Sequence, residues 1–254
     1  MDISTGGFLA AIVLGLLLGL RHAADADHVV AVSTIVSEEG NVWRGLWVGA
    51  SWGLGHTTPL LLLGVVILFL KDPVLSRYEA IAPVLEFGVG IMLVFLGIQV
   101  FWRLHQKRLH IHEHLASARP HVHVHAHSPE AERVGDPYQS HRPSGSGKPF
   151  FRLKSFVVGI VHGLAGSAAV MLLLLPQAPS FLVGFTYILL FGLSTILSMA
   201  GITLVLGTPF VLTTKVASVN RWIVGIAGSL SLLFGLALMS DIALGTHLLE
   251  FLPE

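Results

Sequence analysis

The chain contains no cysteine, and only 12% of its 254 residues are charged. Without thiols it forms neither disulfides nor zinc–thiolate centres, so a metal site has to use imidazole, carboxylate, thioether, hydroxyl or carbonyl donors. A soluble domain is about a quarter charged, whereas 53% of this chain is hydrophobic and its mean hydropathy is +0.76. Fifteen basic residues balance fifteen acidic ones, which argues against a nucleic-acid partner. The composition indicates a protein embedded in the lipid bilayer.

Apolar runs that are long enough to cross a bilayer recur along the chain. A spanning helix needs about 20 mostly apolar residues. Such runs lie at residues 7–34, 43–70, 79–102, 155–178, 181–211 and 220–240. The first and fifth exceed the required length, which predicts that they tilt or break. We therefore expect an all-α polytopic membrane protein with six transmembrane helices.

One segment interrupts these runs. Between residues 103 and 153, His, Arg, Pro, Ser and Gly replace the apolar residues, and this composition predicts a disordered loop. The loop would separate two three-helix halves, residues 1–102 and 154–254. In a six-span arrangement, most Lys and Arg residues fall in this loop or in other segments on the same side of the membrane. The positive-inside rule then places the loop in the cytoplasm and both termini outside the plasma membrane.

The two halves share short patterns in the same order. The matched pairs are GLRH (19–22) with GIVH (159–162), GLGHT (53–57) with GLSTI (192–196), and Gly90/Gly97 with Gly228/Gly235. Because three spans per repeat give the halves opposite orientations, the pattern predicts a 3+3 inverted pseudo-repeat. Transporters of this type bind substrate near the midplane, where the halves meet.

The strongest functional signal is the polar run HAADADH inside the first apolar stretch. It contains His22, Asp25, Asp27 and His28. Ionisable groups in hydrocarbon cost several kcal/mol unless they are paired or hydrated, so they are functional candidates. On an ideal helix, at about 100° per residue, Asp27 points away from the arc of the other three. Either the helix unwinds near Ala23–Ala26 or only some of the four act as ligands; a polar cap on a shorter helix is the alternative.

Two further histidines lie within apolar spans. His56 belongs to GLGHTT, beside Thr57, and His162 lies among small residues in GIVHGLAGSAA. Each is either a metal ligand or a histidine that is hydrogen-bonded inside the bundle. Ser194 and Thr195 could contribute hydroxyl groups, although hydroxyls in spans are common. Imidazole with carboxylate suits divalent ions such as Ni²⁺, Co²⁺ and Zn²⁺.

The central loop is rich in histidine, which predicts an auxiliary site for metal capture. Nine of the fourteen histidines lie there: His105, His110, His112, His114, His121, His123, His125, His127 and His141. Such tracts bind transition metals, and alternation suits a flexible chelator. A solvated linker is the alternative interpretation.

RHAADADHVVAVST resembles the signature of the nickel/cobalt transporter family, His-x4-Asp-His, here carried by His22, Asp27 and His28. GLGHTT is similar to the second motif of that family. The resemblance implies a secondary permease for Ni²⁺ or Co²⁺ without a prosthetic group, in which the first-motif His and Asp residues are required. GIVHGLAGSAA is similar to a branch of short six-span proteins associated with urease-accessory or nickel-transport roles.

We therefore expect a divalent-metal permease whose metal path uses His22, Asp25, Asp27, His28, His56 and His162. No ATP-binding motif is present, and the absence of a nucleophile elbow, phosphate-binding loop or zinc-protease motif argues against an enzyme. One alternative is a membrane accessory protein that hands nickel to an enzyme or metallochaperone. Another is a permease for a different small solute in a related scaffold.

Overall fold

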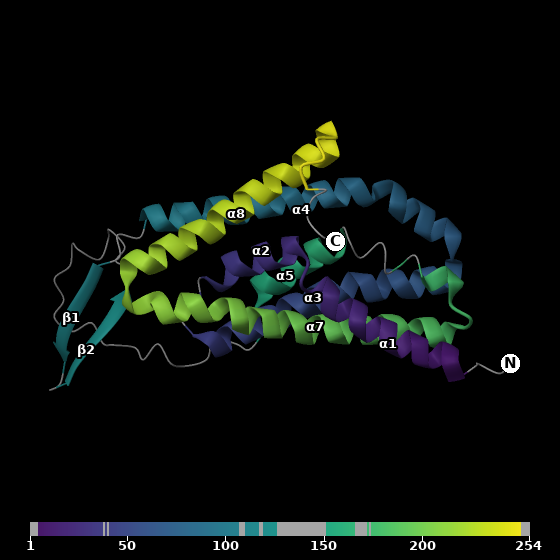
Figure 1. The fold of residues 1–254 in the computed structure, drawn as a ribbon, viewed down its shortest axis with the longest axis horizontal. Coiled ribbons are helices and arrows are strands. Elements are labelled where there is room, and N and C mark those ends of the chain that lie inside the picture. Colours follow the sequence, from purple (N-terminus) through teal and green to yellow (C-terminus); the bar gives the residue numbers. More distant parts are fainter. Residues whose placement is uncertain are drawn as a thin grey trace.

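The computed structural model describes residues 5–37, 39, 41–106, 110–116, 119–125, 151–165, 172 and 174–249. Helices dominate it (Figure 1). The α-helices are α1 Thr5–His22, α2 Ala26–Val36, α3 Val42–Leu70, α4 Asp72–Gln106, α5 Leu153–Gly163, α7 Phe181–Leu212 and α8 Ala217–Leu244. Two short 3₁₀ helices are η2 Leu175–Gln177 and η3 Thr213–Lys215, and two strands are β1 His110–Ala116 and β2 Arg119–His125.

The described residues include four helices that are long and apolar enough to cross a bilayer, namely α3, α4, α7 and α8. Helices α1 and α2 meet the same test together, as one broken span. Helix α5 is apolar but shorter, and part of the span expected at 155–178 lies outside the described residues. The chain is therefore an α-helical membrane protein with four or five candidate spans in its described part.

The first span is broken inside the polar run. Helix α1 ends at His22 and α2 begins at Ala26, with a bend of 56° between them. Asp25 has an extended backbone, φ −58° and ψ 147°, and is the N-cap residue of α2. The prediction that the chain deforms between Ala23 and His28 is confirmed. The unwound part is shorter than that range, because α2 already includes residues 26–28.

Hydroxyl groups of α7 bind the carbonyl groups of α1 before the break. Ser194 Oγ lies 3.3 Å from Gly15 O and 3.1 Å from Phe191 O of its own helix. Thr195 Oγ1 lies 3.3 Å from Gly19 O and 2.8 Å from Phe191 O, so each hydroxyl shares its one hydrogen between α1 and α7. Ser198 Oγ donates to Leu20 O, also at 3.3 Å. In hydrocarbon, backbone groups freed by a helix break have to find partners within the protein. The break frees Leu20 O, because the amide of Ala24 donates to Arg21 O, and Ser198 supplies a partner for it; Gly19 O still accepts from Ala23 N.

The helices pack in matched pairs. Helix α3 lies along α7, α4 lies along α8, α1 packs against α7, and α5 packs against α3 (Figure 1). Glycines permit close approach in the α4–α8 pair. A Cβ added to Gly97 would lie 2.8 Å from Gly228 O, and one added to Gly235 would lie 2.7 Å from Gly90 O. These contacts show that α4 and α8 run antiparallel.

The α3–α7 pair is antiparallel as well. A Cβ on Gly53 would lie 2.8 Å from the Cα of Ile196, while one on Gly192 would collide with the Thr57 side chain. Trp52 of α3 and Met199 of α7 are buried in the core of this region. Close packing along α3 and α7 therefore fixes the part of the bundle that carries His56.

Strands β1 and β2 form an antiparallel hairpin at the end of the molecule away from the N-terminus (Figure 1). The register pairs His110 with His125, His112 with His123, and His114 with His121. The hairpin lies in the segment expected to be a disordered loop. His127 and His141 lie outside the described residues. The domain boundaries at 102/103 and 153/154 stay predictions.

Candidate metal site

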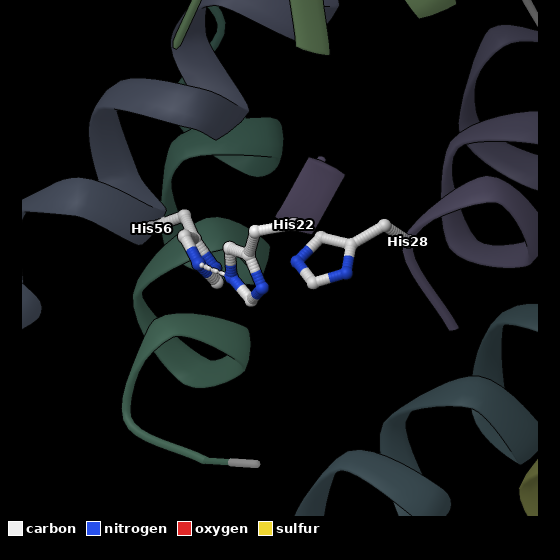
Figure 2. Close-up of side chains that lie close together, drawn as sticks. All are labelled: His22, His28 and His56. Carbon is white, nitrogen blue, oxygen red and sulfur yellow. Dashed lines mark hydrogen bonds between the residues drawn. The ribbon is translucent and has the colours of Figure 1, made fainter. Parts of the chain in front are cut away.

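Four buried histidines from four helices meet inside the bundle. His22 ends α1, His28 lies in the first turn of α2, His56 lies in the middle of α3, and His162 is near the end of α5. Each side chain is at most 2% exposed, and neighbouring ring centroids lie 4.2 to 5.9 Å apart. Figure 2 shows the rings of His22, His28 and His56 directed toward one another. We call these residues, with Asp25 and Asp27, the His–Asp cluster.

Asp25 orients the ring of His22. The two atoms His22 Nδ1 and Asp25 Oδ2 lie 2.9 Å apart. An ionised carboxylate only accepts hydrogen bonds, so Nδ1 carries the proton and Nε2 of a neutral ring keeps its lone pair. That Nε2 lies 2.8 Å from His56 Nε2. A carboxylate that orients a histidine in this way is the usual support of a metal-binding imidazole.

Asp27 joins the two halves of the chain. Its Oδ1 accepts from the backbone N and the ring Nδ1 of His28, both at 2.9 Å. Its Oδ2 accepts from His162 Nε2 at 2.7 Å. Because Asp27 lies in the first turn of α2, the positive end of the helix dipole favours its negative charge. The residue that an unbroken helix would turn away from the cluster is therefore at its centre.

The donor atoms lie close enough together to be candidate ligands of one ion. One ligand atom each of His22, His28 and His56 lies within 4.8 Å of the others, and the same holds for Asp27, His28 and His162. With metal–nitrogen bonds of about 2.1 Å, ligands at right angles lie about 3 Å apart. The 2.8 Å between the Nε2 atoms of His22 and His56 approaches this spacing. The cluster could hold a divalent ion after small side-chain movements.

Several buried ring nitrogens have no hydrogen-bond partner among the described residues. They are Nε2 of His28 and Nδ1 of both His56 and His162. A buried acceptor without a partner costs about 1–3 kcal/mol. A cation bound by such lone pairs would offset this cost. Of these atoms, His28 Nε2 belongs to the ring that faces His22 in Figure 2, and it is a candidate ligand atom.

The hydroxyl groups expected to support the site serve helix packing. Thr57 Oγ1 donates to Gly192 O at 3.3 Å, and Ser194 and Thr195 donate to carbonyl oxygens of α1 and α7. They hold α1, α3 and α7 together around the histidines. Among the loop histidines, His105 is exposed at the end of α4.

Sequence reasoning missed two features of the cluster. Trp52 is fully buried, and its ring lies 5.5 Å from the rings of both His28 and His162. It precedes His56 by one helical turn, which is the signal that could have identified it. Gly163 allows α5 to reach α3, because a Cβ there would collide with the His56 carbonyl group.

Comparison with known proteins finds relatives with diverse names. No family model matches the chain, and no solved structure matches it. It is 24–25% identical to the Arabidopsis thaliana chloroplast proteins FOR GROWTH AND FERTILITY 1 and 2, over 80% and 76% of this chain and 51% and 46% of theirs. It is 36% identical to the urease accessory protein UreH of Bacillus sp. (strain TB-90), over 92% of each chain. The chain belongs to the family of this urease accessory protein.

Proposed function

We propose that the protein is a secondary permease for Ni²⁺, Co²⁺ or both, and that the ion crosses through the His–Asp cluster. The observation that carries the proposal is the convergence of two carboxylates and four buried imidazoles from four helices. The donor set suits these borderline ions, and the motif residues of the nickel/cobalt transporter resemblance form most of it. The name of the UreH relative, a urease accessory protein, agrees with nickel handling and with a role other than catalysis.

We further propose six spans arranged as a 3+3 inverted pseudo-repeat. The helix pairs support this symmetry, because α1 packs on α7 as α5 packs on α3. Exchanging the matched positions of the two halves turns the Gly90–Gly235 contact into the Gly228–Gly97 contact, and both contacts occur. The sixth span would consist of α5 and the residues that follow it. It would correspond, in the second half, to the broken pair α1 and α2 of the first half.

The distribution of basic residues supports a cytoplasmic loop and external termini. Helix α3 begins and α4 ends toward the side of the bundle that carries β1 and β2 (Figure 1). Arg44 lies in the first turn of α3 and Arg103 in the last turn of α4, whereas Lys71 and Arg77 lie at and just after the link from α3 to α4. Cytoplasmic ends of membrane proteins carry the excess of Lys and Arg. In this orientation the loop histidines would capture the metal ion on the cytoplasmic side.

The proposed mechanism uses the cluster as a dehydrating site near the midplane. His56 lies at the middle of α3, so an ion bound there is far from both surfaces. The ion would exchange its waters for imidazole nitrogens and carboxylate oxygens, which are fixed in orientation by Asp25 and Asp27. Access would alternate as the two halves rock against each other around this site.

A second candidate function is delivery of nickel to an enzyme without transport. The name of the UreH relative favours it, and the cluster could hold nickel in either role. A permease for an anionic solute is disfavoured, because the cluster presents carboxylates and imidazole lone pairs, and Arg21 is exposed on the bundle surface.

Flux through liposomes separates these functions. Purified protein would be reconstituted around a metal-sensitive dye, and entry of Ni²⁺ and Co²⁺ would be compared for wild type, His22→Ala, Asp27→Ala and the control Gly201→Ala. Gly201 has nothing within 4 Å of an added Cβ. Flux in wild type and control alone supports the permease. Metal binding without flux favours delivery, and wild-type flux in both site variants contradicts the proposed site.

A further inference from the structure

The His–Asp cluster contains two sets of three donors that overlap at one residue. His22, His28 and His56 form the first set, and Asp27, His28 and His162 form the second. His28 is the residue that belongs to both. A single compact site would give one set of mutually close donors, so the division into two sets requires an explanation.

The two nitrogens of His28 have different surroundings. Nδ1 lies 2.9 Å from Asp27 Oδ1, on the side of the second set. Nε2 is buried without a hydrogen-bond partner among the described residues, and Figure 2 shows the ring directed toward His22, in the first set. The ring itself is 1% exposed. One imidazole therefore presents a different nitrogen to each set of donors.

We propose that the transported ion occupies two overlapping positions, one on each side of His28, and that these positions are filled alternately. The inference rests on the proposed transport function and adds a relay to it. In the first position the ion binds His28 Nε2 with Nε2 of His22 and of His56, and the proton that His56 Nε2 donates to His22 when no ion is bound moves to His56 Nδ1. In the second it binds His28 Nδ1 with Asp27 and His162.

The chemistry of imidazole makes the positions mutually exclusive. A neutral ring has one lone pair and one N–H group, so it binds an ion on one nitrogen and holds a proton on the other. When the ion moves to the second position, the Nδ1–H bond of His28 breaks and an Nε2–H bond forms. His162 likewise gives up its Nε2 proton and takes one at Nδ1. Both rings stay neutral, and no net proton is consumed.

Asp27 has a different role in each position. With the ion in the first position, its carboxylate accepts the N–H groups of His28 and His162 and orients both rings. With the ion in the second position, it becomes a ligand. Asp25 contacts His22 and stays an orienting group throughout. The relay therefore passes the ion from a site of three imidazoles to a site of two imidazoles and a carboxylate.

The test uses full-length protein in which the nine histidines of residues 105–141 are glutamine, so that the loop binds no metal. Ni²⁺ and Co²⁺ are titrated into this protein, and nickel X-ray absorption counts the bound imidazoles. His56→Gln removes a donor of the first position, and His162→Gln removes a donor of the second. His247→Gln, at an exposed residue after the end of α8, is the control.

We expect one ion per chain in the parent protein. Each site variant should still bind one ion, about 10–100-fold more weakly, with three imidazoles in His162→Gln and two in His56→Gln. Liposome flux of Ni²⁺ should be lost in both variants and kept in the control. Two ions per chain, identical ligand sets in the two variants, or flux retained in either would overturn the relay.

The outcomes also separate the relay from the transport function. If the two variants show the different ligand sets but the wild-type protein gives no flux, transport fails and the two binding positions stand. If the wild-type protein gives flux but the ligand sets are identical, transport stands and the relay fails. Both variants replace one side chain by another of similar length, and size-exclusion profiles verify that they fold.

Discussion

Asp27 Oδ2 accepts a hydrogen bond from His162 Nε2 at 2.7 Å, although the two residues are 135 positions apart. The contact joins the broken first span to α5 in the other half of the chain. The same carboxylate accepts from the His28 ring, so one side chain contacts two buried histidines, one from each half of the chain. The predictions below test how much of the site depends on this carboxylate, on the close helix contacts and on the loop.

Asp27→Asn should impair Ni²⁺ binding and flux more than Asp25→Asn. His28 and His162 donate to different oxygens of Asp27, and in asparagine one of these becomes an NH₂ group that cannot accept, whereas Asp25 orients a single ring. Loss of an orienting carboxylate costs about 10–100-fold in metal affinity, and we expect at least this for Asp27. Isothermal titration of Ni²⁺ into protein whose loop histidines are replaced by glutamine measures the loss of affinity. Equal losses in the two variants would contradict the central role of Asp27.

Gly163→Ala should reduce both thermal stability and metal binding. The added Cβ would collide with the His56 carbonyl group, so α5 has to move away from α3 and take His162 with it. Gly201→Ala is the matched control, because its Cβ would meet nothing within 4 Å. Replacing glycine in a helix by alanine otherwise stabilises by about 0.5–1 kcal/mol. A melting temperature in detergent that is unchanged in Gly163→Ala would argue against the close contact between α5 and α3 at Gly163.

Thr195→Val should destabilise the protein by about 0.6–1.7 kcal/mol, the range for hydrogen bonds between membrane helices. The hydroxyl group of Thr195 lies 3.3 Å from Gly19 O in α1, in addition to 2.8 Å from Phe191 O in its own helix. Thr208→Val is the control, since the Thr208 hydroxyl binds Leu204 O within its own helix. Unfolding in mixed micelles compares the two. A control that loses as much stability would show that the hydroxyl group does not hold the broken helix.

Deletion of residues 105–141 should leave liposome flux of Ni²⁺ unchanged while lowering the number of ions that the protein retains. None of the donors in the His–Asp cluster comes from that segment. A chain of equal length with the loop histidines replaced by glutamine separates loss of histidine from loss of the linker. Equilibrium dialysis counts the retained ions. Flux that falls in the glutamine chain would place the loop on the transport path.

The sequence predicted the long helices closely. Residues 43–70 and 181–211 became Val42–Leu70 and Phe181–Leu212, because an apolar run of spanning length has few other structures open to it in a membrane. The span expected at 155–178 is less regular, since α5 ends at Gly163. Run length does not reveal an interruption among small residues such as those that follow His162.

The helix break was also predictable, but the partners of its residues were not. The turn of about 100° per residue in an ideal helix is local geometry, and it correctly required a deformation if Asp27 was to join the cluster. It gave no reason to pair Asp27 with His162, because that contact depends on how α2 and α5 pack. Trp52 was missed for the same reason. A tryptophan in an apolar span is ordinary in sequence, and only tertiary packing places it against two histidines.

The hydroxyl groups that receive the end of α1 have a consequence for biosynthesis. Leu20 O is bound by Ser198 of α7, while Gly19 O has both Ala23 N and Thr195. The ribosome adds Ser198 long after α1 has been made, and until then an unbroken first helix would satisfy Leu20 O from within. We therefore expect the break to be stabilised when α7 enters the membrane, and the His–Asp cluster is complete only once His162 of the second half has been inserted.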